Sequence, residues 1–469
     1  MTRKNILSLL FICSSLISAM ANSNEDSTAI FRPDYHFTPL KNTMGTPVGL
    51  VKSADDYHLF YEYNPQSLED ENYTLGHAVS KDLINWKEQP AAFAGAEGGL
   101  NGASCTTDIN NALGKQAGEQ PTFLLAYGVK NKGIKIAYST DAGTSWNTLT
   151  DKVELTCELT DDAKDPKLMW HEPLKCFVLL VSRIPEGDVD ANGISFYTSK
   201  NLTDWTFTSH IRGLSGAPDL FRLPLHGDAN ENKWVLSDAQ GNYMLGDFNG
   251  KSFSAITSVQ QNQGGDFHSP ITLQEEGRTI QLAAISRKYI KGSQYNGVLS
   301  IPMELQLQKQ GEQPIKLVKK PLEELRSLSS RPVLKIRNKK LIPGLNDNPM
   351  KRLKGVSTHI NGVFDLNNVD AFGFLILNSR KEDGTELMYN AKKNTISWKG
   401  TSIDVNPVDN RIEIEIFIDK STVEIFINGG EQVISSQIEH GADNDRYVLA
   451  AQGGELLIET LNAQVRGEK

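Results

Sequence analysis

Three titratable side chains, Glu62, Asp165 and His268, are of the kinds that act as general acids, bases or nucleophiles in enzymes. They lie far apart along the chain, so they can act together only if the fold brings separate segments to one place. A pair of carboxyl groups facing one bond is the arrangement that hydrolyses glycosidic linkages. Each residue also has a bland structural interpretation: a solvated rim residue for Glu62, a turn residue before Pro166 for Asp165, and a hydrogen-bonded framework histidine for His268.

The cysteines show no metal-binding pattern. Once an N-terminal leader is removed, Cys105, Cys157 and Cys176 remain, an odd number without metal-like spacing. One disulfide with a free thiol, or no disulfide at all, both fit this count. No cofactor-binding motif is visible, and we predict neither a cofactor nor a metal-ligating set.

The N-terminus has the features of a secretion signal. A basic start precedes an apolar stretch from Ile6 to about Ile17, and Ala19-Met-Ala21 supplies the small residues that a signal peptidase accepts. An N-terminal anchor is the alternative, but the apolar stretch is short for a membrane span. We therefore predict residues 1–21 as a signal peptide, a secreted or periplasmic protein, and no later membrane span.

Composition describes a globular protein of two domains. A chain of 469 residues is too long for one ordinary domain. Its formal net charge of -9 argues against a nucleic-acid partner, which needs clustered Lys and Arg. Helical periodicity is nearly absent, whereas short runs such as Tyr57–Tyr61 and Thr122–Tyr127 are bounded by turn-forming residues. These runs predict β-strands throughout.

A repeated turn predicts how the first strands are arranged. Ser80-Lys-Asp-Leu-Ile-Asn-Trp86, Ser139-Thr-Asp-Ala-Gly-Thr-Ser-Trp146 and Ser199-Lys-Asn-Leu-Thr-Asp-Trp205 are variants of one turn, and each follows a small strand. The Asp or Asn can bind backbone N–H groups within the turn, and the Trp can anchor it. A four-stranded unit recurring about every 60 residues indicates a β-propeller. The segment from Asp247 to Phe253 is a candidate fourth copy.

The pattern changes after about residue 315. Residues 316 to 340 are polar and basic, and we predict a linker over 316–334. Farther on, Arg411–Asp419 and Thr422–Ile427 alternate apolar and polar residues, and the turn Asn428-Gly-Gly follows them. Neighbouring amphipathic strands of this kind predict a β-sandwich over 335–469.

Several motifs resemble glycoside hydrolase family 32, the family of invertases and levanases. Tyr57–Pro65 resembles its "YHLFYQYNP" segment, Gly76–Trp86 its "GHAVSKDLVHW" segment, Lys164–His171 its "RDPKVFWH" segment, and Ser421–Asn428 its "SSVEVFVN" segment. The resemblance covers nearly the whole mature chain. It implies an all-β protein with a five-bladed β-propeller, here over 30–315, followed by a C-terminal β-sandwich.

The catalytic positions of that family are not matched. The family's nucleophile is the Asp of "WMNDPNG" and its acid/base is the Glu of "ECPDLF"; the corresponding runs place Thr46 and Gly216 there. A threonine hydroxyl with no visible base beside it is a poor nucleophile, and glycine has no proton to donate. Of the three carboxylates that the resemblance implies, only that of the "RDP" motif is kept, as Asp165. Ordinary β-fructosidase activity is therefore disfavoured.

Other pocket positions also differ from the family. The resemblance places Glu62 where the family has Gln, and His268 where it has Tyr, so both changes introduce titratable groups. We predict Asp165, Glu62 and His268 as the catalytic groups of a rebuilt pocket. The predicted substrate-binding residues are Lys164, Thr46 and Asn101.

Two classes of function follow. The first is an enzyme acting on a non-fructan glycan, either by inverting hydrolysis or by elimination from a uronate whose acid Lys164 could neutralise. The second is a glycan-binding pseudoenzyme that keeps the fold without its chemistry. The expected partner in both is an oligo- or polysaccharide. The sugar, the linkage and the oligomeric state stay open.

Overall fold

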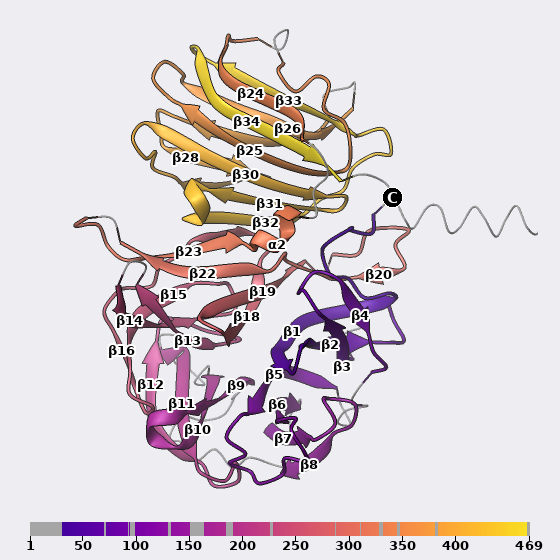
Figure 1. Cartoon of the computed structure of the whole chain (residues 1–469), viewed down its shortest axis with the longest axis vertical. Helices are drawn as coiled ribbons and strands as arrows, with labels where there is room; N and C mark the ends of the chain where they lie inside the picture. The colour runs from indigo at the N-terminus through magenta and orange to yellow at the C-terminus, as the bar shows by residue number, and fades with distance from the viewer. Residues whose placement is uncertain are drawn as a thin grey trace, which may run out of the picture.

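The computed structural model describes residues 31–466, apart from 70–71, 92, 94–98, 130–132, 151–163, 184–190, 226–227, 287, 310, 328–331, 345–347 and 380–382. Its regular secondary structure consists almost entirely of strands, which form a propeller packed against a sandwich (Figure 1). The predicted signal peptide and Cys157 lie outside the described residues. Cys105 and Cys176 are buried free thiols. None of the described helices is long and apolar enough to cross a membrane.

The N-terminal part is a five-bladed propeller, which confirms the predicted fold. Blade one contains β1 (Asn42–Ser53), β2 (Asp56–Asn64), β3 (Thr74–Ser80), β4 (Trp86–Glu88) and the short β20 (Tyr295–Asn296). Blade two contains β5 (Leu100–Asp108), β6 (Thr122–Val129), β7 (Gly133–Ser139) and β8 (Asn147–Thr150). Blade three contains β9 (Lys164–His171), β10 (Cys176–Arg183), β11 (Gly193–Ser199) and β12 (Thr206–Arg212).

The last two blades share one continuous sheet, joined where β13 pairs with β22. Blade four contains β13 (Asp219–Leu225), β14 (Asp228–Ser237), β15 (Tyr243–Phe248) and β16 (Phe253–Ala255). Blade five contains β18 (His268–Glu275), β19 (Arg278–Ser286), β21 (Val298–Leu299), β22 (Met303–Gln308) and β23 (Lys316–Pro321). The ring closes where β20, from the end of the propeller, pairs in parallel with β1 at its start.

The repeated turn joins the third and fourth strands of a blade. Trp86, Trp146 and Trp205 each donate the indole N–H to a backbone carbonyl three residues earlier, at 3.0, 3.2 and 3.0 Å. In each turn the leading serine hydroxyl donates to the Asp or Asn two residues later. In blade four, Asn249 accepts two backbone N–H bonds and the buried Phe253 follows the turn where the other blades have Trp. The repeat seen in the sequence is therefore one structural unit used four times.

The C-terminal part is a sandwich of two antiparallel sheets (Figure 1). The five-stranded sheet contains β26 (Ala371–Asn378), β27 (Thr385–Asn390), β28 (Thr395–Trp398), β29 (Thr401–Asp404) and β33 (Arg446–Gln452). The other sheet contains β24 (Pro332–Leu341), β25 (Ser357–Asp365), β30 (Arg411–Asp419), β31 (Thr422–Ile427), β32 (Gln432–Gln437) and β34 (Leu456–Val465). The alternation in β30 sets its orientation, because Ile412, Ile414 and Ile416 are buried in the core between the sheets.

The two parts are joined by shared structure. A propeller segment, β17 (Gln263–Gly265), pairs in parallel with β32 and so extends the second sheet of the sandwich to seven strands. The stretch 316–334, predicted as a linker, contains β23, the short helix α2 (Glu323–Ser327) and the start of β24. Chain continuity and strand pairing therefore both connect the propeller to the sandwich.

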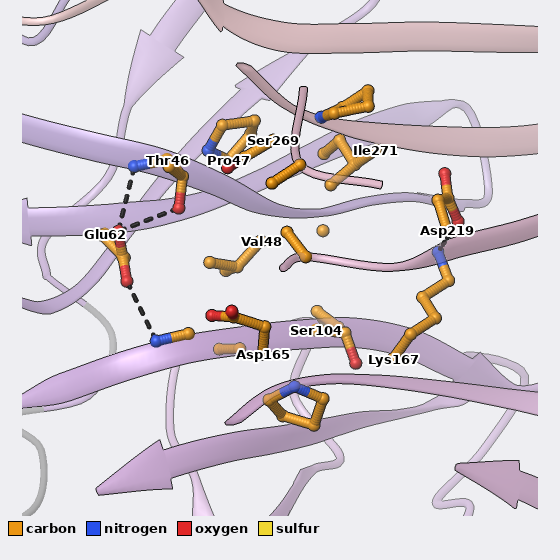
Figure 2. Close-up of a pocket in the computed structure, with 18 of the residues that line it drawn as sticks. Thr46, Pro47, Val48, Glu62, Ser104, Asp165, Lys167, Asp219, Ser269 and Ile271 are labelled. Carbon is orange, nitrogen blue, oxygen red and sulfur yellow. Dashed lines mark hydrogen bonds and ion pairs between the residues drawn. The ribbon is translucent and has the colours of Figure 1, made fainter. Parts of the chain in front are cut away.

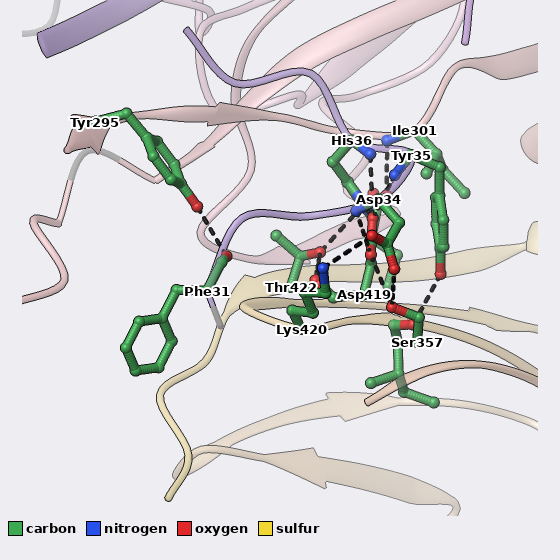
Figure 3. A network of polar contacts seen from close by, with 12 residues as sticks. Phe31, Asp34, Tyr35, His36, Tyr295, Ile301, Ser357, Asp419, Lys420 and Thr422 are labelled. Carbon is green, nitrogen blue, oxygen red and sulfur yellow. Dashed lines mark hydrogen bonds and ion pairs between the residues drawn. The ribbon is translucent and has the colours of Figure 1, made fainter. Parts of the chain in front are cut away.

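A buried polar cluster crosses this junction (Figure 3). His36, in the segment before β1, places Nδ1 2.9 Å from Asp419 and Nε2 2.9 Å from Glu424, and all three side chains are fully buried. Asp419 also accepts the backbone N–H groups of residues 34, 35 and 36. Glu424 accepts bonds from the backbone N–H of Ile301 and the hydroxyl of Ser435, each at 2.7 Å. The N-terminal segment is thus tied to both β30 and β31.

Candidate functional site

A pocket lies on the propeller axis, at the N-terminal part of the innermost strand of each blade. It has a volume of about 280 Å³ and is lined mainly by residues from or next to β1, β5, β9, β13 and β18, with Glu62 from β2. β1 contacts β5 and β18, β5 contacts β9, and β13 contacts β18, so these strands surround the axis. The pocket therefore collects side chains from all five blades (Figure 2).

Irregular strand pairing shapes the wall of this pocket. The pairing register shifts between Met44 and Pro47 in β1, between Leu100 and Ala103 in β5, and between His268 and Ile271 in β18. β9 pairs irregularly with β10 over its first residues as well, next to Asp165. Such bulges redirect side chains, and they are common beside functional sites. The pocket residues Thr46, Asn101 and Asp165 all lie at these irregularities.

Glu62 forms one end of the pocket and holds its neighbours in place (Figure 2). Its Oε2 accepts the backbone N–H of Thr46 at 3.0 Å and the Thr46 hydroxyl at 2.9 Å. Its Oε1 accepts the backbone N–H of Gly102 at 3.3 Å. The residue is only 5% exposed. A carboxylate therefore does lie beside the Thr46 hydroxyl, although no base was visible there in the sequence.

Asp165 occupies the wall next to Glu62 (Figure 2). Its backbone is left-handed, with φ of 51°, a conformation that is uncommon for residues other than glycine. Burial raises the pKa of Asp165, while the charge of Lys164 and a hydrogen bond from the backbone of Ala217 lower it, and the net shift is upward. A carboxyl group with a raised pKa is a better proton donor near neutral pH than an ordinary Asp.

Lys167 and Asp219 form an ion pair at the opposite end of the pocket, which the sequence analysis did not assign to the site (Figure 2). The Lys167 ammonium is 2.6 Å from Oδ1 of Asp219, whose side chain is 1% exposed. The other carboxylate oxygen, Oδ2, is buried and has no hydrogen-bond partner among the described residues. Buried polar atoms are usually paired, so a ligand hydroxyl is a suitable partner here.

The predicted site residues divide into two groups. Thr46, Glu62, Asn101 and Asp165 line the axial pocket together. Lys164 and His268 do not belong to the described lining, although each is next to a residue that does. The ring of His268 contacts the backbone carbonyl of Asp266 through Nδ1 at 3.0 Å. The structure therefore brings two of the three predicted catalytic groups, Glu62 and Asp165, into one pocket.

Gly216 lies just outside the described lining, next to Ala217, which belongs to it. Its φ of +72° is in the left-handed region, and a Cβ added there would lie 2.8 Å from the Cβ of Ala239. Its backbone N–H donates to the hydroxyl of Ser182 at 2.9 Å. This backbone conformation favours glycine, and an added Cβ would be too close to Ala239 unless one of them shifts.

Two family models together match nearly the whole described chain. The profile described as "Glycosyl hydrolases family 32 N-terminal domain" matches residues 36–321, and "Glycosyl hydrolases family 32 C terminal" matches residues 322–465. The chain belongs to glycosyl hydrolase family 32. The relatives in this family include a levanase of Bacillus subtilis strain 168, 30% identical over 488 residues, which cover 92% of this chain and 70% of the levanase. An extracellular exo-inulinase of Aspergillus niger is 25% identical, with 90% and 92% of the two chains covered.

Solved family 32 structures have the same fold. The exo-inulinase from Aspergillus awamori superposes with a TM-score of 0.80, at 23% identity, over 92% of this chain and 97% of the inulinase chain. A fructan 1-exohydrolase IIa from Cichorium intybus gives a TM-score of 0.76 at 20% identity, over 94% and 98% of the two chains. At this level of identity the similarity establishes only the fold of the chain. The chemistry of its pocket has to be argued from the residues of this chain.

Gly102 lies between Glu62 and Asp165, and its substitution tests the arrangement of these two carboxylates. Its φ is +74°, and a Cβ there would lie 2.3 Å from Oδ1 of Asp165. We expect Gly102→Ala to lower the free energy of unfolding by about 2–4 kcal/mol, through backbone strain and the displaced carboxylate. The matched control is Gly133→Ala, where φ is +75° and no atom of the described residues lies within 4 Å of the added Cβ, so only the strain is expected. Equal destabilisation of the two variants in urea unfolding would contradict the described packing.

Proposed function

We propose that this family 32 protein binds the terminal unit of a neutral, fructan-type oligo- or polysaccharide in the axial pocket and does not cleave it by the family's two-carboxylate route. The observation that carries the proposal is the engagement of Glu62 with Thr46. Aligned with the family motif, Thr46 takes the position of the nucleophile, and its hydroxyl is 2.9 Å from Glu62. A carboxylate is a weak base for an alcohol, so this pair is poorly suited to forming a covalent intermediate.

The position of the acid/base supports the same proposal. Aligned with the family motif, Gly216 takes this position, and its left-handed backbone lies close to Ala239. A glutamate there would be strained in this backbone conformation, and its Cβ would approach the Cβ of Ala239 too closely unless one of them shifts. Both the backbone conformation and the neighbouring Ala239 therefore suit glycine at position 216.

The charge of the pocket favours a neutral sugar. The charged residues of its described lining are the carboxylates Glu62, Asp165 and Asp219 and a single cation, Lys167, which is already paired with Asp219. A uronate or sulfated sugar would face net negative charge, and Lys164 is not part of the lining. This weighs against elimination from a uronate. Sugar hydroxyls, in contrast, can donate to these carboxylates, as in protein hydrogen bonds to charged groups generally.

The family relationship supports a fructan-type ligand. The relatives are levanases and exo-inulinases by name, and solved relatives were obtained in complex with fructosylnystose and with 1-kestose. Export is proposed from the N-terminal leader, and several relatives are described as extracellular. An altered hydrolase is the second candidate. It is favoured by the raised pKa of Asp165, a possible proton donor, and by Glu62 on the other side of Gly102.

Calorimetric titration with 1-kestose and longer inulin oligosaccharides tests this proposal, with an oligogalacturonate as the anionic comparison. We expect binding of the fructans and none of the uronate. Asp165→Asn should weaken fructan binding about 10- to 100-fold, because it removes hydrogen bonds to a charged acceptor. Asp247→Asn, at an exposed position of blade four, should leave it unchanged. Product analysis of the same mixtures separates the candidates: bound sugar without product supports the binding protein, and products that disappear with Asp165→Asn support the altered hydrolase. Absence of fructan binding would overturn the proposal.

A further inference from the structure

A second, smaller pocket lies at the junction of the propeller and the sandwich and shares no residue with the axial pocket. It is bounded by the N-terminal segment, by α2 and by the strands β25, β30 and β34. The lining residues are Tyr35, Leu325, Ser357, Thr358, His359, Phe417, Gln464 and Arg466. The space open to the centre of a water-sized sphere is about 20 Å³, enough for one water molecule or one monatomic ion of similar size.

Three polar atoms of this junction pocket are buried and have no hydrogen-bond partner among the described residues. They are Nδ1 of His359, Oε1 of Gln464 and Nη1 of Arg466. Strand pairing brings them together, because His359 lies directly opposite Gln464 across the β25–β34 ladder, and the backbone N–H of Arg466 donates to the carbonyl of Ser357 at 3.0 Å. Buried polar atoms are usually paired, and these three are close enough for one small ligand or water molecule to serve them together.

The charges around the pocket indicate what this ligand is. In the described part of the chain, Arg466 forms no ion pair, and its guanidinium lies over the ring of Tyr35, 5.4 Å from the centroid. The acids that contact the lining residues already have partners: Glu415 is engaged by Nε2 of His359 at 2.8 Å and by Arg326 at 3.2 Å, and Asp34 by Lys420 and the hydroxyl of Ser357. A water molecule could satisfy the hydrogen bonds, but an anion would in addition compensate the positive charge of Arg466, a partly buried residue whose Nη1 is buried.

We propose that the junction pocket binds a small monovalent anion of halide size. Arg466 donates to it from Nη1 and supplies the fixed positive charge. Gln464 can turn its amide so that the NH₂ group, in place of the oxygen, faces the anion. His359 lines the same pocket, and the contact of its Nε2 with Glu415 fixes the position of its ring. A bound anion would thus link β25 and β34 of the sandwich to Tyr35 and α2 on the propeller side.

Bromide is the probe for this site, because its anomalous scattering distinguishes it from water. Crystals of the full chain grown in sodium bromide should show an anomalous peak within hydrogen-bond distance of Nη1 of Arg466. In solution, replacing sodium gluconate by sodium bromide at constant ionic strength should raise the melting temperature by about 2–4 °C, since gluconate is too large for the pocket. Arg466→Gln should abolish this increase, whereas Arg352→Gln, at an exposed arginine, should retain it.

Two outcomes would overturn the anion site. One is a water molecule without anomalous signal at Arg466 in bromide-grown crystals. The other is a response to bromide of the same size in the wild type and in Arg466→Gln. The crystallographic measurement uses the wild-type chain, so it decides the question even if the Arg466 variant folds poorly.

Discussion

Replacing His36 with alanine is expected to lower the free energy of unfolding by about 3–5 kcal/mol, one of the largest effects of any single substitution in this chain. His36 lies between Asp419 and Glu424 at 2.9 Å from each, and the substitution would leave two fully buried carboxylates without their shared cation. Urea unfolding measures the loss. His440→Ala is the matched control, because that histidine forms no ion pair in the described part of the chain. A loss below about 1 kcal/mol for His36→Ala would show that the cluster is not the stabilising contact described.

The same cluster predicts a loss of stability in alkali. Burial alone would lower the pKa of His36, but the hydrogen bonds and charges of Asp419 and Glu424 raise it to about 9. The unfolded value is about 6.5, so this contribution is complete below about pH 6.5 and is lost as the pH rises through 9. The amount is about 3 kcal/mol. The pKa of Asp419 is lowered, so its own contribution is present above pH 4 and is lost in stronger acid.

His36→Gln separates this effect from other titrations. Burial lowers the pKa of Lys319 to about 7, so Lys319 favours folding increasingly as the pH rises from 7 toward 10, the opposite direction to His36. The difference in unfolding free energy between wild type and His36→Gln cancels the Lys319 contribution. That difference should shrink by about 3 kcal/mol between pH 6.5 and pH 10. A difference that does not change with pH would mean that His36 is neutral in the folded protein.

The fold could be predicted from the sequence because its repeated elements are local. The turns that end in Trp86, Trp146 and Trp205 form their bonds within a few residues, so the pattern specifies the structure without long-range information. The alternation in Arg411–Asp419 likewise determines which side chains enter the core of the sandwich. Contacts across the junction, such as His36 with Asp419, join residues nearly four hundred positions apart, and no local pattern indicates them.

The site was harder to predict, because strand irregularities decide which residues face the pocket. Along β18, Ser269 lines the pocket and His268, its neighbour, does not. Successive residues of a regular strand point to opposite sides. The bulge between His268 and Ile271 interrupts this alternation, so the sequence alone does not tell which of these residues faces the pocket. The pair of Lys167 and Asp219 was missed for another reason: each looks like ordinary family framework until the fold brings them within 2.6 Å.

Restoring the family's carboxylates is expected to fail, and this is the second large effect. Unmodified protein should release fructose from sucrose, inulin or levan at least about 10⁴-fold more slowly than a working levanase measured in parallel, because under the proposed alignment Thr46 and Gly216 replace the family's nucleophile and acid. Thr46→Asp with Gly216→Glu should stay near this background. An Asp at 46 would place a second carboxylate beside Glu62, in the position where the Thr46 hydroxyl now donates to it at 2.9 Å. The resulting repulsion would raise the pKa of one of the two groups.

The Gly216→Ala variant is the control for the strain that a side chain at position 216 introduces. Gly216→Ala introduces the left-handed penalty and the 2.8 Å approach to Ala239 without a carboxylate, so it should cost about 1–3 kcal/mol of stability, as Gly216→Glu does. Adding Ala239→Gly to the double variant relieves the approach, and adding Glu62→Gln removes the repulsion with residue 46. If fructose release appears only when both additions are present, the surroundings of Thr46 and Gly216 have become incompatible with the family's chemistry. Release by the simple double variant would show instead that the pocket still supports it. Robust release by the unmodified chain would mean that the catalytic carboxylates lie elsewhere, and that Thr46 and Gly216 do not occupy the family's catalytic positions.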